Sequence, residues 1–183
     1  MIGLIVDGQG DYAAFRARYG ATVRVLKTSR ARGHTVPCAT LIASAKKEIA
    51  MLKAFRCAPI AIVTDLEGRT QSAHDFCQLA RREMEGRAEY EDVILLASDT
   101  MIENWFLADI VHLSSQKKYL KTVKVQRSFE STHGKRELKK LFATGHDYNE
   151  TRHSAELFPL VRGAIAAGFS PSFARFRTAL GVD

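Results

Sequence analysis

Short apolar runs alternate with longer amphipathic segments through residues 1–109, and this alternation is the strongest constraint on the fold. The runs at 2–6, 59–64 and 92–98 are almost entirely apolar, as in strands that helices cover on both faces. Residues 21–27 alternate apolar and polar side chains, which also predicts a strand. Strands separated by helices predict βαβ units and therefore a mainly parallel sheet.

The segments between and after these runs have the spacing of amphipathic helices. We expect an α/β fold with a mainly parallel sheet of about four strands flanked by helices. Residues 1–113 would form this core, and 114–183 a basic helical C-terminal extension packed on it, in a single domain overall. The expected helices span 11–19, 38–55, 71–86, 101–113, 134–143, 154–167 and 171–180.

Composition excludes several classes of protein. A hydrophobic fraction of 46% supports a globular chain, and no apolar run approaches the roughly 20 residues of a membrane span. The opening MIGLIVDGQG lacks the basic start of a secretory signal. The three cysteines form no CxxC pair, so neither a disulfide framework nor a zinc site is indicated. We therefore expect a cytoplasmic protein that has no membrane partner.

Positive charge is concentrated in the C-terminal part of the chain. Residues 1–109 hold 14 Lys/Arg and 14 Asp/Glu, whereas residues 110–183 hold 13 and 6. The net charge of +7 therefore arises entirely from the second segment. Such an asymmetry indicates either a polyanionic partner or a solvated basic helical face, and charge alone does not separate the two.

Acidic side chains follow three of the four predicted strands. Asp7 follows the first, Asp65 and Glu67 follow the third, and Asp99 and Glu103 follow the fourth. In a parallel sheet these carboxyl ends meet at one edge, where functional groups gather. Residues i and i+2 of an extended chain point to one side, so Asp65 and Glu67 are expected to converge on one cation. Oxygen ligands without His or Cys favour Mg²⁺ or Mn²⁺.

Each acid also has a structural explanation. Asp11 is a good N-cap for the helix that follows it. Thr100 and Glu103 match the capping box, in which the glutamate only holds down the start of a helix. Asp65 and Glu67 would suit a solvated turn before GRT. What favours a metal site is the presence of acids at three strand ends of the same sheet.

Three short motifs resemble one known family. The segments are IGLIVDGQGDYAAF, ASDTMIENWFLAD and SPSFARFRTAL. The first begins at residue 2 and the last ends at residue 180, so the matches are distributed over nearly the whole chain. They resemble a small stand-alone TOPRIM-like family of unknown function that is related to RloB and found in bacterial defence loci. The resemblance implies that the predicted sheet is TOPRIM-like (Rossmannoid). The TOPRIM fold is shared by topoisomerases, primases and nucleases of the overcoming-lysogenization-defect class.

The resemblance implies roles for three acids. The TOPRIM acid after the first strand is usually a glutamate that acts as general acid or base, and Asp7 stands at that position. The D-x-D pair that binds Mg²⁺ corresponds to Asp65 and Glu67. Asp7 is thus one methylene shorter than the usual residue and Glu67 one longer, and a misplacement near 1 Å can reduce a rate about 100-fold.

The leading hypothesis is a Mg²⁺- or Mn²⁺-dependent nuclease or related phosphoryl-transfer enzyme. Asp65 and Glu67 would hold the metal, and Asp7, assisted by Glu103, would act as general base or as a further ligand. The resemblance adds a role in anti-phage defence and an ATPase partner. DNA or RNA would be bound through backbone contacts with Lys117, Lys118, Lys121, Lys124, Arg127, Lys135, Arg136, Arg175 and Arg177.

Aromatic residues in the second and third motifs have a simpler explanation. Trp105 is expected in the core, with Phe173 and Phe176 packed on the sheet and Arg175 and Arg177 facing outward.

Two other functions compete with the nuclease. One is a non-catalytic subunit that binds nucleic acid or an ATPase, which the shortened Asp7 favours. The other is a phosphotransfer domain with Asp65 as its nucleophile, which needs a lysine or a Ser/Thr cluster nearby to bind phosphate. Thr64 and Thr70 match loosely, but no lysine follows DLEGRT.

Overall fold

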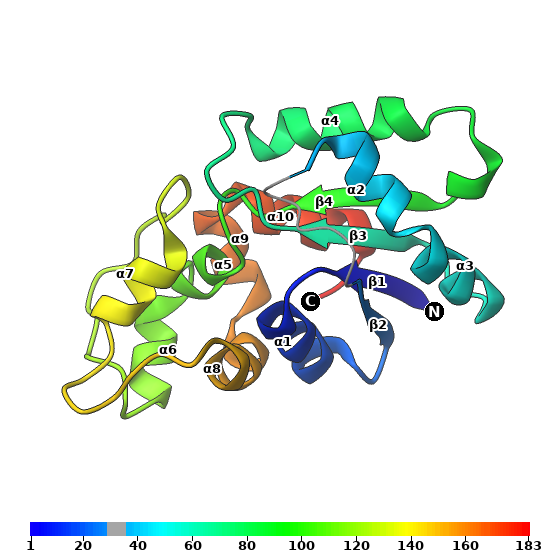
Figure 1. Cartoon of the computed structure of the whole chain (residues 1–183). Helices are drawn as coiled ribbons and strands as arrows, with labels where there is room; N and C mark the ends of the chain where they lie inside the picture. Colours follow the sequence, from blue (N-terminus) through cyan, green and yellow to red (C-terminus); the bar gives the residue numbers. More distant parts are fainter. Residues whose placement is uncertain (29–35) are drawn as a thin grey trace.

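A four-stranded parallel sheet forms the centre of the computed structural model, which describes residues 1–28 and 36–183 (Figure 1). The strand order is β2-β1-β3-β4, and every neighbouring pair is parallel. The predicted α/β class, with a parallel sheet flanked by helices, is therefore confirmed for the described residues. The strands are β1 (Ile2–Val6), β2 (Val23–Lys27), β3 (Ile60–Thr64) and β4 (Val93–Ala97).

Helices connect the strands and make up most of the C-terminal part. Those before β4 are α1 (Gln9–Tyr19), α2 (Cys38–Ser44), α3 (Lys46–Ala54), α4 (Ala73–Met84) and the short 3₁₀ turn η1 (Ala88–Tyr90). Those after β4 are α5 (Glu103–Leu107), α6 (Ile110–Gln116), α7 (Gly134–Lys140), α8 (Glu150–Leu157), η2 (Phe158–Leu160), α9 (Gly163–Phe169) and α10 (Pro171–Leu180).

The two faces of the sheet are buried in separate cores, because successive strand residues point to opposite sides. Ile5, Ile60 and Ile62 pack with the apolar sides of α2, α3 and α4. Leu4 and Ala61 pack on the other face with α1 and with helices of the C-terminal part. Figure 1 shows α2 and α4 on one side of the sheet and α1 on the other.

The C-terminal part contributes large aromatic side chains to the second core. Phe158, Phe173 and Phe176 are buried in the same cluster as Leu4 of β1. Trp105 is fully buried, and its ring centre lies 5.2 Å from that of Phe173 and 5.0 Å from that of Phe176. The predicted core positions of these three residues are confirmed. Two of the motifs therefore meet in the interior of the protein.

Some expected helices are interrupted. The helix predicted at 38–55 divides at Ala45, whose N–H donates to the carbonyl of Ile42 three residues earlier, a 3₁₀-type bond that tightens the turn. The helix predicted at 101–113 divides at Asp109, which has φ −132° and ψ 33°. The buried Asp109 carboxylate accepts hydrogen bonds from the Arg162 backbone and guanidinium, at 2.7 to 3.0 Å. The helix predicted at 154–167 likewise ends at Leu157.

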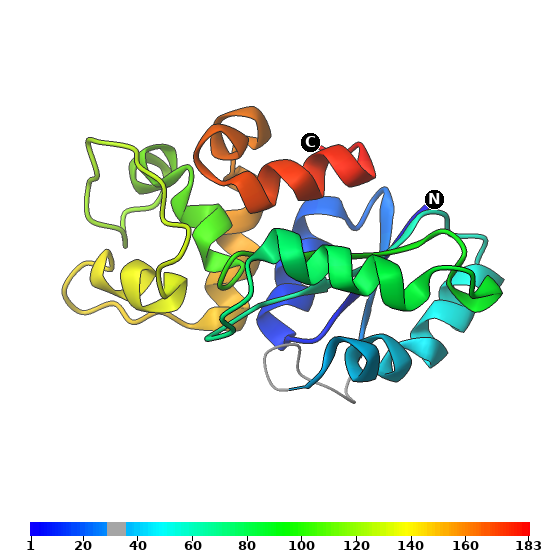
Figure 2. The same cartoon turned by 90° about the horizontal axis from the view of Figure 1, so that it is seen from above.

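All four strands point their carboxyl ends toward the same region. Figures 1 and 2 show α5, α6, α7 and α8 beyond these ends, whereas α3 lies near the amino ends. The helices of the C-terminal part thus border the edge of the sheet where the acidic residues were expected.

Candidate active site

The strand order reverses between β1 and β3, because β2 lies on one side of β1 and β3 on the other. Ligands of open α/β sheets bind outside the carboxyl ends of the strands at such a switch point. Asp7 follows β1 directly, and Asp65 follows β3. The Thr64 hydroxyl lies 3.3 Å from Asp7 Oδ2 and donates to it. The fold therefore places two of the predicted site residues at the point where it favours a ligand.

Asp65 is held by groups that follow β4. Its Oδ1 accepts a hydrogen bond from Ser98 Oγ at 2.7 Å and another from the Ile102 N–H at 3.0 Å. Burial raises the pKa of Asp65 well above its ordinary value, and the charges of Asp11 and Glu103 raise it further. The carboxyl is thus fixed in orientation while its ionised form is disfavoured. A bound cation would reverse that preference.

Asp11 belongs to the same cluster, although the sequence assigned it no site role and explained it as the N-cap of a helix. Helix α1 begins at Gln9 with Gly8 as its N-cap, so Asp11 lies inside the first turn. Its side chain is buried, and burial followed by the charges of Asp7 and Glu103 raises its pKa well above the ordinary value. Helical spacing from Asp11 to the buried Ala14 and Phe15 is the signal that predicts an inward carboxylate.

At the start of α1 the backbone lies very close to two carboxylate side chains. A Cβ atom on Gly8 would lie 2.5 Å from Asp11 Oδ2, and a Cβ on Gly10 would lie 2.5 Å from Glu150 Cγ. Neither separation is sterically acceptable, so glycine at both positions lets the chain pass beside the two carboxylates.

Glu103 is the most deeply buried acid of the cluster, with 0% exposure. Its Oε1 accepts a hydrogen bond from the Tyr148 hydroxyl at 2.7 Å, whereas Oε2 has no hydrogen-bond partner among the described residues. Burial raises the pKa of Glu103 to about 7, and Lys135 and Tyr148 oppose that rise. A buried oxygen of this kind needs a proton or a cation to be satisfied.

The capping-box interpretation of Glu103 is wrong. Helix α5 begins at Glu103 itself, and its N-cap is Ile102, which makes no side-chain cap. Asn104 is the residue that reaches back, since its Oδ1 accepts a hydrogen bond from the Met101 N–H at 3.3 Å. Glu103 is thereby free to point into the acidic cluster.

Lys135 supplies the cation within this cluster. Its Nζ lies 3.2 Å from Glu150 Oε2 and 3.7 Å from Glu67 Oε1. Burial alone would lower the pKa of Lys135, but the charges of Glu103, Glu150 and Asp65 outweigh that effect and raise it. The residue was predicted to contact the backbone of a nucleic acid, and the structure instead turns it toward the acids. Lys135 and Glu150 come from the distant helices α7 and α8.

Glu67 does not share the extended geometry on which its predicted pairing with Asp65 depended. It has φ 22°, and its N–H donates to the Thr100 carbonyl at 2.8 Å. Its carboxylate lies beside Lys135, and the acids whose charges raise the pKa of Asp65 are Asp11, Glu103 and Asp7. The predicted i, i+2 convergence is therefore replaced by a cluster of Asp7, Asp11, Asp65 and Glu103, drawn from three separate segments.

A divalent cation fits this cluster only together with water or substrate. No three His, Cys, Asp or Glu side chains within residues 1–28 and 36–183 are placed to hold a metal ion by themselves. Mg²⁺, however, usually takes one or two carboxylates and completes its shell with waters and substrate phosphates. Asp7 and Asp65 supply such donors, and Glu103 Oε2, which has no hydrogen-bond partner among the described residues, needs a proton or a cation. The residues therefore fit Mg²⁺ or Mn²⁺, but not in the expected Asp65–Glu67 arrangement.

The remaining basic residues of the prediction have varied surroundings. Lys117 is half-buried, and its Nζ lies 3.9 Å from Glu156 Oε2. Lys121 is exposed and donates to the Lys140 carbonyl at 2.9 Å. The other exposed members are Lys118, Lys124, Arg127 and Arg136.

The two arginines of α10 were expected to face outward, but the structure does not place them fully on the surface. Arg175 and Arg177 are both half-buried. Arg177 forms an ion pair with Asp183, and its Nε is buried without a hydrogen-bond partner among the described residues. A Cβ on Gly163 would lie 2.8 Å from that Nε, so Arg177 packs closely against the start of α9.

Comparisons with models of protein families, with curated proteins and with solved structures found no match. The relationship to the TOPRIM-like family therefore stays a prediction. Within the described residues, no helix combines the length and the apolar composition that crossing a membrane requires.

Proposed function

We propose that this chain is a Mg²⁺- or Mn²⁺-dependent nuclease, or a related phosphoryl-transfer enzyme, on a TOPRIM-like fold. The observation that carries the proposal is the buried acidic cluster at the switch point. Asp7, Asp11, Asp65 and Glu103 meet there. Burial and the charges of neighbouring carboxylates raise the pKa values of Asp11 and Asp65, and burial raises that of Glu103. Closely spaced carboxylates whose ionised forms are disfavoured make a site that is suited to take up a divalent cation.

The proposed roles follow the geometry. Asp65, oriented by Ser98 and the Ile102 amide, and Asp7, beside Thr64, would hold the metal. When bound, the ion would activate a water molecule and neutralise charge on the phosphoryl oxygens. Asp7 is half-buried and would also accept the proton of the attacking water. This assignment replaces Glu67, which lies beside Lys135, with Asp7 as the second ligand.

Glu103 and Lys135 would adjust the charge of the site: Glu103 near the metal and Lys135 near the phosphoryl group. With 0% exposure, Glu103 does not contact a polynucleotide, and it would instead set the charge under the metal. Lys135 is half-buried, so its ammonium would stabilise negative charge that develops on the phosphoryl group. The proposal extends to DNA or RNA as substrate and, through the family resemblance, to an ATPase partner in anti-phage defence.

The test is a cleavage assay on DNA and RNA with Mg²⁺, with Mn²⁺ and with EDTA. Asp65→Asn should abolish both cleavage and the Mn²⁺ binding that calorimetry measures, without loss of fold. Asp92→Asn is the matched control, because Asp92 is exposed and has φ 62°, a conformation that asparagine also tolerates. Metal binding that is unchanged in Asp65→Asn would refute the assignment. A wild type that binds nucleic acid but never cleaves it would support the non-catalytic subunit.

One contact also favours the phosphotransfer alternative. Asp65 has Ser98 Oγ at 2.7 Å, and it contributes to the raised pKa of Lys135, so the lysine and hydroxyl that this function requires are present after all. Treating the protein with acetyl phosphate and Mg²⁺ and measuring its intact mass decides this point. The addition of one phosphoryl group, lost in Asp65→Asn, would identify a phosphotransfer domain.

A further inference from the structure

The two edges of the sheet differ in how they are protected against pairing. Edge strand β2 carries Arg24 and Lys27, and the Arg24 guanidinium lies 3.9 Å from the ring centre of Phe55. Edge strand β4 has the sequence VILLA, without a charged or polar side chain. Charged residues on an edge strand hinder the addition of another strand, and an apolar edge invites it. The edge at β4 therefore lacks the charges that would hinder the addition of a strand.

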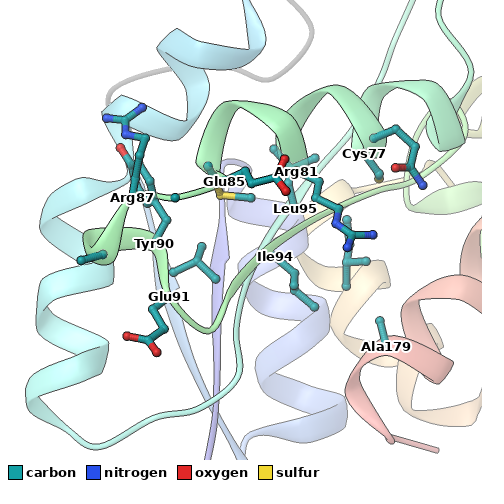
Figure 3. A pocket seen from close by; sticks show the side chains of 15 residues that line it. Cys77, Arg81, Glu85, Arg87, Tyr90, Glu91, Ile94, Leu95 and Ala179 are labelled. Atoms are coloured by element: carbon teal, nitrogen blue, oxygen red, sulfur yellow. The ribbon is translucent and has the colours of Figure 1, made fainter.

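A groove of about 830 Å³ runs along β4 between α4 and α10 (Figure 3). Its apolar lining includes Met84 of α4, Ile94 and Leu95 of β4, and Ala179 of α10. Figure 3 shows Ile94 and Ala179 on the side of the groove opposite α4. The groove is remote from the acidic cluster, because none of the acids of that cluster lines it. This surface is therefore separate from the proposed active site.

Half of the backbone groups of β4 point away from β3, toward this groove. The carbonyl of Asp92 accepts from the Ile60 N–H, and the Ser98 N–H donates to the Thr64 carbonyl, so the even-numbered residues of this stretch bond to β3. Because successive peptide groups of a strand point in opposite directions, those of Val93 and Leu95 point toward the open edge. An added strand would meet donors and acceptors at both positions.

Charges around the groove indicate which strand is added. Four exposed charged residues line the groove: the positive Arg81 and Arg87 and the negative Glu85 and Glu91. Two positive and two negative side chains on one patch can each find an opposite charge on an identical patch turned about a two-fold axis. We propose that β4 pairs antiparallel with β4 of a second copy of this chain, which gives one sheet continuous across the dimer.

Two complementary charge variants test the proposal without knowledge of the register. Arg81→Glu with Arg87→Glu makes the four charged positions uniformly acidic, and Glu85→Arg with Glu91→Arg makes them uniformly basic. By light scattering after size exclusion, the wild type should have twice the chain mass of 20.4 kDa. Each double variant alone should be monomeric, and an equimolar mixture of the two should restore the dimer. Circular dichroism confirms that both variants are folded.

The matched control is Lys47→Glu with Arg82→Glu, which makes the same charge change at exposed positions outside the groove. It should remain dimeric. Amide hydrogen exchange gives a second measurement, because the Val93 and Leu95 amides should be protected at high protein concentration and lose protection on dilution. A wild type that is monomeric at all concentrations, or a dimer that persists in both double variants, overturns the proposal. So does a monomer whose groove binds an apolar peptide instead.

Discussion

Glu103→Gln is the substitution whose effect the structure specifies most closely. It preserves the shape of the side chain and its ability to accept the Tyr148 hydrogen bond, but it removes a negative charge from a position with 0% exposure. The pKa of Glu103 rises from its ordinary 4.5 to about 7 on folding. The folded state therefore holds the proton more tightly than the unfolded state. Stability from this group is complete below pH 4.5 and is lost as the pH rises through about 7.

The size of the effect follows from the shift. A difference of about 2.5 pKa units, at about 1.4 kcal/mol for each unit, corresponds to roughly 3 kcal/mol of unfolding free energy above pH 7. The glutamine variant does not titrate and so avoids this loss. We expect it to match the wild type near pH 4.5 and to exceed it by about 3 kcal/mol at pH 8. With a urea m-value of about 2 kcal/mol/M, the midpoint would rise by about 1.5 M.

The assay is urea unfolding of both proteins in EDTA at several pH values between 4.5 and 8. Glu85→Gln, at an exposed site, controls for the loss of one carboxylate and should leave the pH dependence unchanged. An identical pH dependence in wild type and Glu103→Gln would show that Glu103 is not a strained, buried carboxyl. A variant that is less stable at pH 8 would refute the reasoning altogether.

Three further predictions concern other residues. Lys135→Met should lower the melting temperature more at pH 8 than at pH 5, because at pH 8 the acids around Lys135 are ionised and lack its positive charge. Calorimetry measures this, and an equal loss at both pH values would contradict the prediction. Lys118, Lys124 and Arg136 are exposed. Replacing all three with Ala should reduce the slope of log affinity against log salt concentration by about two to three, equally for all nucleic-acid sequences. An unaltered slope would place the nucleic acid elsewhere. Trp105→Ala should cost about 3–5 kcal/mol in urea unfolding, since the ring is fully enclosed by Phe173 and Phe176, and a loss under 1 kcal/mol would contradict that packing.

The sheet was predictable because its signal is local. Three of the strands are buried on both faces, so each appears as a short apolar run that needs no knowledge of its partners. The interruptions of the helices were not predictable in the same way. Asp109 ends α5 through its bonds to Arg162, which lies 53 residues further along the chain. Local spacing favours a continuous helix there, and a tertiary contact overrides it.

The candidate site was likewise predictable only where it depends on the order of the strands and not on distant contacts. Asp7 and Asp65 were found because adjacent parallel strands bring their carboxyl ends together, a rule that needs only the order of elements. Glu67 was misplaced because Glu67 and Gly68 both have positive φ and redirect the chain, which agrees with the alternative of a turn before GRT and not with the extended pairing. Lys135, Tyr148 and Glu150 were missed as partners of the acids because they come from the C-terminal part, whose docking the sequence does not specify.

The location of Lys135 changes what the charge asymmetry of the chain means. By sequence it belongs to the densest basic run, yet its ammonium pairs with Glu67 and Glu150, and its charge lowers the pKa values of Asp11 and Glu103. Tyr148 likewise comes from the C-terminal part and binds Glu103. Without these contacts, the buried charges of Asp11 and Glu103 would lack their nearest compensation, and burying unpaired carboxylates is strongly unfavourable. Residues 114–183 therefore complete the acidic site and do more than attach a basic surface to a finished core.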